Sequence, residues 1–546
     1  MSKKRILVTA ISVICSVVLL LGTVIGIWNH AKTQSGMKQY ALAVKTLQEE
    51  SVKPDGSYQV SEALITALRN ATYTQPKNII LMIGDGMGIT AVEAARRVYR
   101  DCLYDGMLAM NYMPVQSSQA TYSAGNDVTD SAAGATALAT GYKTTNKIVG
   151  MDFMGQVPYT TLLEIAAARG MATGIVSNED ITDATPAAFT AHVPVRYNQK
   201  DIAAMQLQML ADGTLDLVLG GGYGFYEAEP NADVLMQVQN AGVTYSRSWD
   251  EIQSASLPFC GLFAETFIET RDETLPQITQ LTDLALRQLD EAPNGFFLMV
   301  EGAHIDTYGE AMNFERTVEE VYAFDCAVAI AMRYVAMHPD TVLVVTADHE
   351  TGGLWIPAEE TNENKTEHTF ESRQHSSRKV PLYAVGYNTQ TLVGLQENTD
   401  VAIFLASLMG EEEFGQKSTI LSKDNDEIQV TFSKEQSAYV MDEKYMPSVD
   451  KSMGIVTMFH ITMENPGDTP SALPELVFGV GKRTYEAVPQ VHYLDAGEKM
   501  VVSYTVPYEL RAYRQYSKVQ SVYLALEEDA RMVISDIQIT TRPAGK

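Results

Sequence analysis

Short apolar runs alternate with longer helical stretches through the central part of the chain. Helical patterns such as Thr160–Arg169 and Phe314–Tyr334 separate these runs. Because the runs are apolar throughout and do not alternate with polar residues, they are typical of parallel strands buried on both faces. The pattern therefore predicts an α/β fold, a doubly wound and mostly parallel sheet with helices on both faces. The predicted strands are Asn78–Ile83, Thr173–Ser177, Leu215–Leu219, Gly295–Val300, Thr341–Ala347 and Pro381–Val385.

The pattern changes beyond about Lys417. From there, shorter segments alternate apolar and polar residues and are separated by turn residues, as in strands with one solvent-facing side. We expect residues 417–546 to form a β-sandwich-like accessory domain. Its predicted strands are Glu427–Phe432, Gly454–Met463, Pro474–Phe478, Lys499–Val506, Val519–Leu526 and Arg531–Thr540.

The N-terminal segment carries a different pattern. Basic residues at positions 3–5 precede an uncharged stretch, Ile6–Trp28, which has the length of about 20 residues that a membrane-spanning helix needs. We expect residues 1–30 to be an uncleaved membrane anchor with the rest of the chain outside the cytoplasm. The reason is that the end of a membrane-spanning helix that carries basic residues stays in the cytoplasm. If the segment is cleaved, the protein is secreted. Residues 31–75 are polar and helix-prone, which predicts a stalk or leading helix.

Length and charge narrow the classes of function. At 546 residues the chain is longer than one hydrophobic core ordinarily serves. We therefore divide its body into a catalytic domain at 76–416 and the accessory domain. The 40 basic against 68 acidic residues leave a net charge of −28, which argues against a nucleic-acid partner. The four cysteines form neither a disulfide framework nor a zinc-binding spacing.

Candidate metal ligands follow four of the predicted strands. Ligands in a parallel sheet gather just beyond the carboxyl ends of its strands, so these side chains are expected at one edge. Oxygen and nitrogen ligands from four strands favour a metal site over unrelated surface acids. The residues are Asp85 after the first strand, Asp183 and Thr185 after the second, Glu301 after the fourth, and Asp348 and His349 after the fifth.

Ser131 is the candidate nucleophile. Small helix-forming residues follow it directly, and Thr129 or Asp130 can cap the start of that helix. A serine at a helix N-terminus lies where exposed N–H groups and the helix dipole favour an anion, including a phosphoryl group. The alternative for this segment alone is a serine that merely lies at the helix cap.

Five sequence blocks, taken together with their order, resemble the alkaline phosphatases between Asn78 and Tyr387. The resemblance implies a metal-dependent hydrolase of phosphate monoesters, bacterial and either membrane-anchored or secreted. The blocks are NIILMIGDGMG, DSAAGATALATGYKT, TDATPAAFTAHVPVR, VEGAHID and VTADHETGGL, followed by a looser HSSRKVPLYAVG.

The resemblance implies a role for each matching residue. Ser131 matches the serine that is phosphorylated. Asp85, Asp348 and His349 match the ligands of the zinc ion beside that serine. Arg196 matches the arginine that binds two phosphate oxygens through its forked guanidinium.

A magnesium ion is implied as well. Its ligands match Asp85, which bridges to the zinc site, together with Thr185 and Glu301, all oxygen donors as a hard cation prefers. Asp183 matches a residue that acts on this ion through water.

The second implied zinc site matches Asp306 and His375 but departs from the family at its third ligand. The family's usual histidine four residues after that aspartate is Glu310 here. Glutamate can bind zinc, yet a second carboxylate favours harder cations such as magnesium, manganese or calcium. We consider His304 as an alternative ligand, because in an extended segment it would face the same side as Asp306.

The reaction implied by resemblance is two successive in-line displacements at phosphorus, first by Ser131 and then by water. Three alternatives stay open: a related phosphodiesterase, a related sulfatase, and a degraded enzyme that binds phosphate or metal at the cell surface, which Glu310 motivates. The DSAA segment and the set formed by Arg196, Thr185 and Glu301 favour the monoesterase. A homodimer is expected by resemblance alone.

Overall fold

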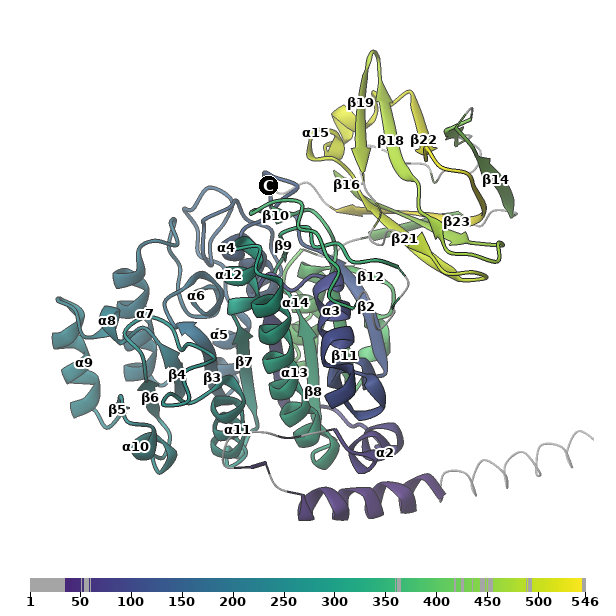
Figure 1. The fold of residues 1–546 in the computed structure, drawn as a ribbon. Coiled ribbons are helices and arrows are strands. Elements are labelled where there is room, and N and C mark those ends of the chain that lie inside the picture. Colours follow the sequence, from purple (N-terminus) through teal and green to yellow (C-terminus); the bar gives the residue numbers. More distant parts are fainter. Residues whose placement is uncertain are drawn as a thin grey trace, which may run out of the picture.

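The computed structural model of the chain describes two folded parts (Figure 1). The predicted membrane anchor at 1–30 lies outside the described residues. Within the described part, no helix combines the length and apolarity that crossing a membrane requires. Residues 35–49 form a helix. The described residues are 35–50, 52–53, 58, 60–358, 360, 365–416, 419–423, 427–434, 436–441, 447, 449, 455–487, 489 and 493–542.

A ten-stranded sheet forms the centre of the first part, in the order β12-β2-β11-β8-β1-β7-β3-β4-β6-β5. Neighbouring strands are parallel except β11, which is antiparallel to both β2 and β8. The strands are β1 (Asn78–Gly84), β2 (Val115–Ala120), β3 (Ala172–Asp180), β4 (Leu217–Gly221), β5 (Thr244–Ser246), β6 (Phe259–Leu262), β7 (Phe296–Gly302), β8 (Thr341–Thr346), β11 (Val380–Val385) and β12 (Leu395–Glu397). The predicted, mostly parallel α/β sheet is therefore confirmed.

Helices cover both faces of this sheet, as the all-apolar strands predict. Strand β1 shows the arrangement: Ile80 and Met82 belong to one apolar core, whereas Ile79, Leu81 and Ile83 belong to the other. The first core contains residues of α3 (Ile89–Tyr99), α11 (Ile278–Leu289) and α13 (Phe314–Met337), and the second contains residues of α4 (Ser131–Thr140), α5 (Leu162–Ala168), α6 (Ala184–Thr190), α7 (Gln199–Asp212) and α14 (Asn398–Leu408).

Shorter elements complete this part. They include a two-stranded sheet in which β9 and β10 pair antiparallel. The elements are α2 (Glu62–Asn70), α8 (Tyr223–Tyr226), α9 (Asn231–Asn240), α10 (Trp249–Gln253), α12 (His304–Glu310), β9 (Glu350–Thr351), β10 (His375–Ser376) and the 3₁₀ helices η1 (Arg100–Cys102), η2 (Tyr104–Gly106), η3 (Ala109–Tyr112) and η4 (Thr389–Leu392).

The second part, which we call the β-unit (described residues between 419 and 542), contains two antiparallel sheets. Their inner faces share one apolar core, to which Phe459 and Ile461 contribute from one sheet and Phe478 and Leu524 from the other. This is the sandwich that the alternating pattern predicts. The elements are β13 (Thr419–Lys423), β14 (Ile428–Phe432), β16 (Ile455–Glu464), β21 (Lys499–Thr505) and β23 (Ala530–Arg542) in the first sheet, β15 (Ala438–Val440), β18 (Glu475–Val480), β19 (Arg483–Ala487) and β22 (Ser521–Ala525) in the second, the pair β17 (Ser471–Ala472) and β20 (Tyr493–Leu494), and helices α15 (Tyr508–Arg511) and α16 (Tyr513–Tyr516).

Candidate active site

The carboxyl ends of three adjacent central strands bring acidic residues together. Strand β1 lies between β7 and β8, and Ile83 is in register with both Glu301 and Thr346. Asp85 follows β1 and Asp348 follows β8, so these two carboxylates reach the same edge as Glu301. All three residues are buried. The fold thus concentrates negative charge at one edge of the sheet.

Asp85, Asp348 and His349 form the first group of candidate metal ligands. One ligand atom from each lies within 4.8 Å of the others. His349 Nε2 is 3.3 Å from an oxygen of each aspartate. The same nitrogen is 3.2 Å from Ser131 Oγ, so the candidate nucleophile borders this group.

Ser131 is the first residue of α4. Asp130 is the N-cap and accepts a hydrogen bond from the Ala133 N–H, as expected for a helix start. The helix is buried throughout and passes very close to the ligand strand: a Cβ on Gly134 would lie 2.6 Å from the carbonyl oxygen of Asp348. Glycine is therefore required here for Ser131 to come this close to the carboxylates.

A second group contains Asp306, His349 and His375, again with ligand atoms within 4.8 Å of one another. His375 Nε2 is 3.5 Å from Asp306 Oδ1. The imidazole rings of His349 and His375 are stacked, with centroids 3.6 Å apart. Because His349 belongs to both groups, the two candidate sites adjoin each other.

Glu310 lies at the margin of the second group. It follows Asp306 by four residues on α12, so both face the same side of that helix. Glu310 Oε1 is 3.8 Å from His375 Nε2, and its side chain is 51% exposed. Burial and the nearby Asp306 raise the pKa of Glu310. From this position the Glu310 carboxylate could coordinate a metal ion from the solvent side of the second group.

His304 does not replace Glu310. Residues 304–310 are helical, so the extended segment on which that alternative depended does not exist. His304 points elsewhere, with Nε2 3.3 Å from Glu179 Oε2 and Nδ1 3.3 Å from Asn178 Nδ2. The helical conformation therefore does not support the alternative in which His304 is a ligand, and His304 is instead a buried histidine with polar neighbours.

The predicted magnesium ligands lie beside the first group. Thr185 Oγ1 donates to Asp85 Oδ2 over 3.4 Å. Ser177, the last residue of a predicted strand, donates from Oγ to Glu301 Oε2 over 2.5 Å. Ser177 was not among the predicted site residues, although its place at the end of a predicted strand was the available signal.

Arg196 is the basic group that faces these acids. Its guanidinium donates from one nitrogen to both oxygens of Asp183, over 3.1 and 3.0 Å, and its other terminal nitrogen is 3.8 Å from Asp130 Oδ2. Burial by itself lowers the pKa of Arg196, but Asp183, Asp130 and Asp85 more than reverse this. Arg196 therefore stays charged next to the start of α4.

The buried carboxylates need positive charge. Burial, and then the neighbouring acids, raise the pKa of Asp85 well above its usual range and that of Asp348 to about 7. In the described structure Asp85 Oδ1 and Asp348 Oδ2 are buried and have no hydrogen-bond partner. Buried oxygen atoms of this kind are expected to bind a cation. The donor set thus fits divalent metal ions.

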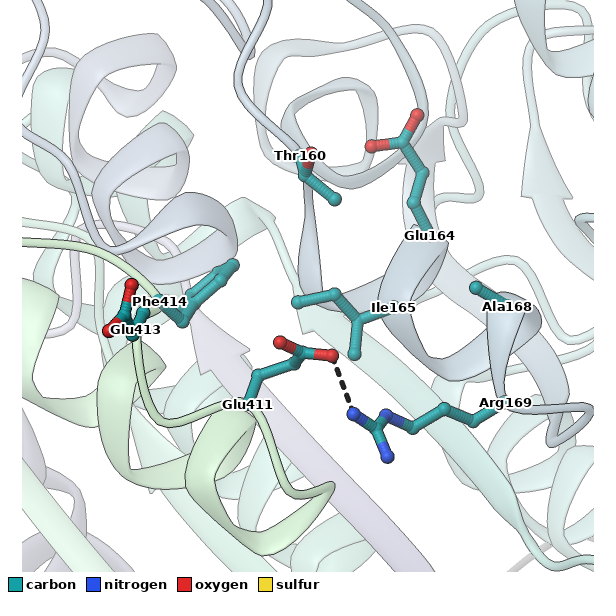
Figure 2. Close-up of a pocket in the computed structure, with 8 residues that line it drawn as sticks. All are labelled: Thr160, Glu164, Ile165, Ala168, Arg169, Glu411, Glu413 and Phe414. Carbon is teal, nitrogen blue, oxygen red and sulfur yellow. Dashed lines mark hydrogen bonds and ion pairs between the residues drawn. The ribbon is translucent and has the colours of Figure 1, made fainter.

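A cavity of about 610 Å³ lies apart from this edge, between α5 and the segment that follows α14 (Figure 2). Arg169 and Glu411 form an ion pair of 2.5 Å across it. It is lined by Thr160, Glu164, Ile165, Ala168, Arg169, Glu411, Glu413 and Phe414, none of them a candidate site residue. This cavity therefore contains none of the candidate ligands.

Comparisons with known proteins agree on one family. A family model described as alkaline phosphatase matches residues 76–359. The repressible alkaline phosphatase of Saccharomyces cerevisiae is 37% identical over 325 residues, which cover 53% of this chain and 57% of the yeast protein. Alkaline phosphatase 3 of Bacillus subtilis is 30% identical over 386 residues, covering 68% of this chain and 82% of the Bacillus protein.

Solved structures give the same result. The alkaline phosphatase of the Antarctic bacterium TAB5 superposes with a TM-score of 0.55 at 29% identity, over 62% of this chain and 99% of that one. One structure of that protein, with His 135 changed to Asp, is described as having Mg bound in the M3 site.

Proposed function

The chain belongs to the alkaline phosphatase family and is a phosphatase, and we propose that it hydrolyses phosphate monoesters through a phosphorylated Ser131. The observation that carries the proposal is the distance of 3.2 Å between Ser131 Oγ and His349 Nε2, at a helix N-terminus beside a group of candidate metal ligands. A serine in this position is exposed both to the helix dipole and to the charge of a bound cation.

Three metal ions complete the proposed site. Zinc would be held by Asp85, Asp348 and His349, and magnesium by Asp85, Thr185 and Glu301, with Asp183 contributing through water. Bound cations supply positive charge that favours the alkoxide form of a serine and offsets the charge of a phosphate group.

The third ion would be held by Asp306, His375 and Glu310. Two carboxylates and one imidazole can bind zinc. They also shift the preference towards harder cations, compared with a site that has one carboxylate and two imidazoles. We therefore assign this position to zinc or to a harder divalent ion.

The side chains support two in-line displacements. Ser131 Oγ attacks phosphorus, its bond to phosphorus forms as the ester bond breaks, and the alcohol leaves. Water then attacks the phosphoserine, which releases inorganic phosphate and restores the hydroxyl. Arg196 would bind two phosphate oxygens in both steps, oriented by its hydrogen bonds to Asp183.

The chain also suggests where this reaction takes place. The apolar stretch Ile6–Trp28 with its preceding basic residues supports a membrane anchor and a catalytic domain outside the cytoplasm. We assign residues 76–416 to the catalytic domain and 417–546 to the accessory domain. A homodimer is proposed from the family resemblance alone.

Hydrolysis of p-nitrophenyl phosphate by the purified chain, in zinc, magnesium and manganese in turn, tests the proposal. We expect metal-dependent turnover that Ser131→Ala reduces by a factor of about 10³ or more. Ser254→Ala, which changes an exposed serine far along the chain, should leave turnover unchanged.

Two other outcomes would replace this function. Phosphate binding without alcohol release in any metal would show a cell-surface binder, the alternative that Glu310 motivates. Faster cleavage of bis-p-nitrophenyl phosphate than of the monoester would show a phosphodiesterase.

A further inference from the structure

The loop that leads into α4 is held by the β-unit. Asp127 lies four residues before Ser131 and forms an ion pair with the guanidinium of Arg511. The backbone N–H of Tyr508 donates to the other oxygen of Asp127 over 3.2 Å. Arg511 is only 4% exposed although it carries a charge. Asp127 is thus bound by two groups from a part of the chain 381 and 384 residues away.

The same loop connects directly to the catalytic groups. Only three residues separate Asp127 from Ser131. Thr129 and Asp130, two of these three, have contacts of their own: the carbonyl oxygen of Thr129 is 2.9 Å from His375 Nδ1, and Asp130 caps α4. A displacement at Asp127 would therefore be transmitted to the helix cap, to His375 and to Ser131 over a few bonds.

The segment that follows α4 contacts the start of α14, which the β-unit also contacts. Lys143 Nζ donates to Asn398 Oδ1 over 2.7 Å. Beside it, Glu397 Oε2 accepts a hydrogen bond of 2.6 Å from the Tyr122 hydroxyl and lies 2.6 Å from a guanidinium nitrogen of Arg542, in the last described strand of the β-unit. Glu397 and Arg542 are almost completely buried.

Tyr122 links the two sets of contacts. Lys143 Nζ and Arg511 Cζ each lie 3.8 Å from the centroid of its ring, within the range of cation–π interactions. Tyr122 also packs against Met458 of β16 in a small apolar cluster. The β-unit therefore contacts the chain directly before the nucleophile helix, and it is linked to the segment after that helix through the start of α14. It lies over this end of the first part (Figure 1).

In these contacts Arg511, Arg542 and Glu397 are buried, whereas the Asp127 side chain is 34% exposed. A surface ion pair contributes little, whereas a buried charge that loses its partner is strongly unfavourable. The arrangement of Asp127, Glu397 and the two arginines is consequently fixed once the β-unit is docked. Displacing a catalytic group by about 1 Å can lower the reaction rate substantially.

We propose that Arg511 and Arg542 of the β-unit are positioning residues for Ser131. The β-unit then completes the phosphatase site by holding the segment that leads into the nucleophile helix and, through Glu397, the start of α14, in addition to any separate binding role. The inference rests on the proposed function, because it assigns these arginines to the reaction of Ser131.

Kinetics of the full chain with Arg511→Ala, Arg511→Lys and Arg542→Lys test the inference, and Arg542→Lys should lower kcat less than Arg511→Ala because it keeps the charge beside Glu397. We expect Arg511→Ala to lower kcat for p-nitrophenyl phosphate about tenfold. The KM and the inhibition constant of inorganic phosphate should change less than about threefold, because the groups that bind phosphate are intact. Arg511→Lys should recover part of kcat, since it keeps the charge opposite Asp127. Arg483→Ala, an exposed arginine of β19 in the same unit, is the matched control.

Hydrogen exchange gives a readout that does not depend on turnover. In Arg511→Ala, amides of residues 121–140 should exchange faster than in the parent chain, while those of β1 and β7 should not change. If Arg511→Ala proves unfolded, Asp127→Asn, which conserves volume, takes its place in both measurements.

The two proposals fail in different ways. Unchanged kcat and unchanged exchange in Arg511→Ala, in a parent chain that is active, would overturn the positioning role and leave the phosphatase intact. A parent chain without turnover would overturn the proposed function. A fall in kcat that Arg483→Ala reproduces would show a general loss of structure and also overturn the positioning role.

Discussion

At the scale of single residues, Glu310 is a predicted site position where this chain departs from the residue that the family resemblance implies. It occupies the site of the family's usual histidine, one helical turn after Asp306, and its carboxylate lies 3.8 Å from His375 Nε2. Carboxylates favour hard cations and imidazoles favour zinc. We therefore expect this one side chain to decide largely which metal ion the proposed third position binds.

Glu310→His is expected to shift metal preference towards zinc. The ratio of activity in zinc to activity in manganese should rise about tenfold, because an imidazole replaces the harder ligand. Metal content measured after equilibrium dialysis against both ions should shift in the same direction. Glu315→His, at an exposed glutamate of α13, is the control, and equal ratios in the two variants would show that Glu310 is not a ligand.

At the scale of elements, the first sheet of the β-unit contains a buried histidine that joins three strands. His460 of β16 contacts Ser503 of β21 through Nδ1, at 3.0 Å, and Thr540 of β23 through Nε2, at 2.7 Å. Burial, with a contribution from Lys379, lowers the pKa of His460 to about 4. The neutral imidazole is therefore the form that the folded sheet accommodates.

The stability of this sheet should consequently fall in acid. The unfolded chain protonates His460 near pH 6.5 and the folded chain only near pH 4. The contribution of His460 to the free energy of unfolding is therefore fully present above pH 6.5. As the pH falls towards 4, protonation of the unfolded chain removes about 3 kcal/mol of it. His460→Gln should remove that part of the loss when urea unfolding is compared between pH 7 and pH 4.5. His368→Gln, at an exposed histidine, should leave the acid-induced loss unchanged. Equal acid sensitivity of the two variants would contradict the assignment of this loss to His460.

At the scale of the whole molecule, a chain with a net charge of −28 gathers several of its acids at one buried edge. Asp85, Glu301 and Asp348 converge there from three adjacent strands, and the first of these has a strongly raised pKa because of burial and its acidic neighbours. Without cations these carboxylates repel one another. Metal binding is therefore expected to contribute to the stability of the fold as well as to the reaction.

Removal of metal should lower the thermal unfolding midpoint. At pH 8, calorimetry in EDTA should give a Tm at least about 5 °C below that in zinc and magnesium, since ligands that bind only the native state stabilise it. Ser131→Ala should show the same difference, because its hydroxyl is not one of the carboxylate ligands. A Tm that is the same with and without metal would rule out a cation at this edge.

Much of the fold was predictable from local patterns. The six predicted strands correspond to β1, β3, β4, β7, β8 and β11, because a continuous apolar run reports burial on both faces. Strands such as β5 and β12, of three residues each, carry too little pattern to be found. The antiparallel direction of β11 also has no local signal, since direction depends on the path of the chain between strands.

The sequence by itself determined what depends on neighbouring residues: the class of fold, the helix that starts at Ser131, and the acids that follow strand ends. These follow from periodicity, from capping and from the rule that parallel strands end at one edge. The tertiary structure alone decided that Ser177 supports Glu301. It also paired Arg511 with Asp127 across 384 residues. Side-chain partners that distant are selected by packing and by the need to pair buried charge, and neither leaves a local pattern in the chain.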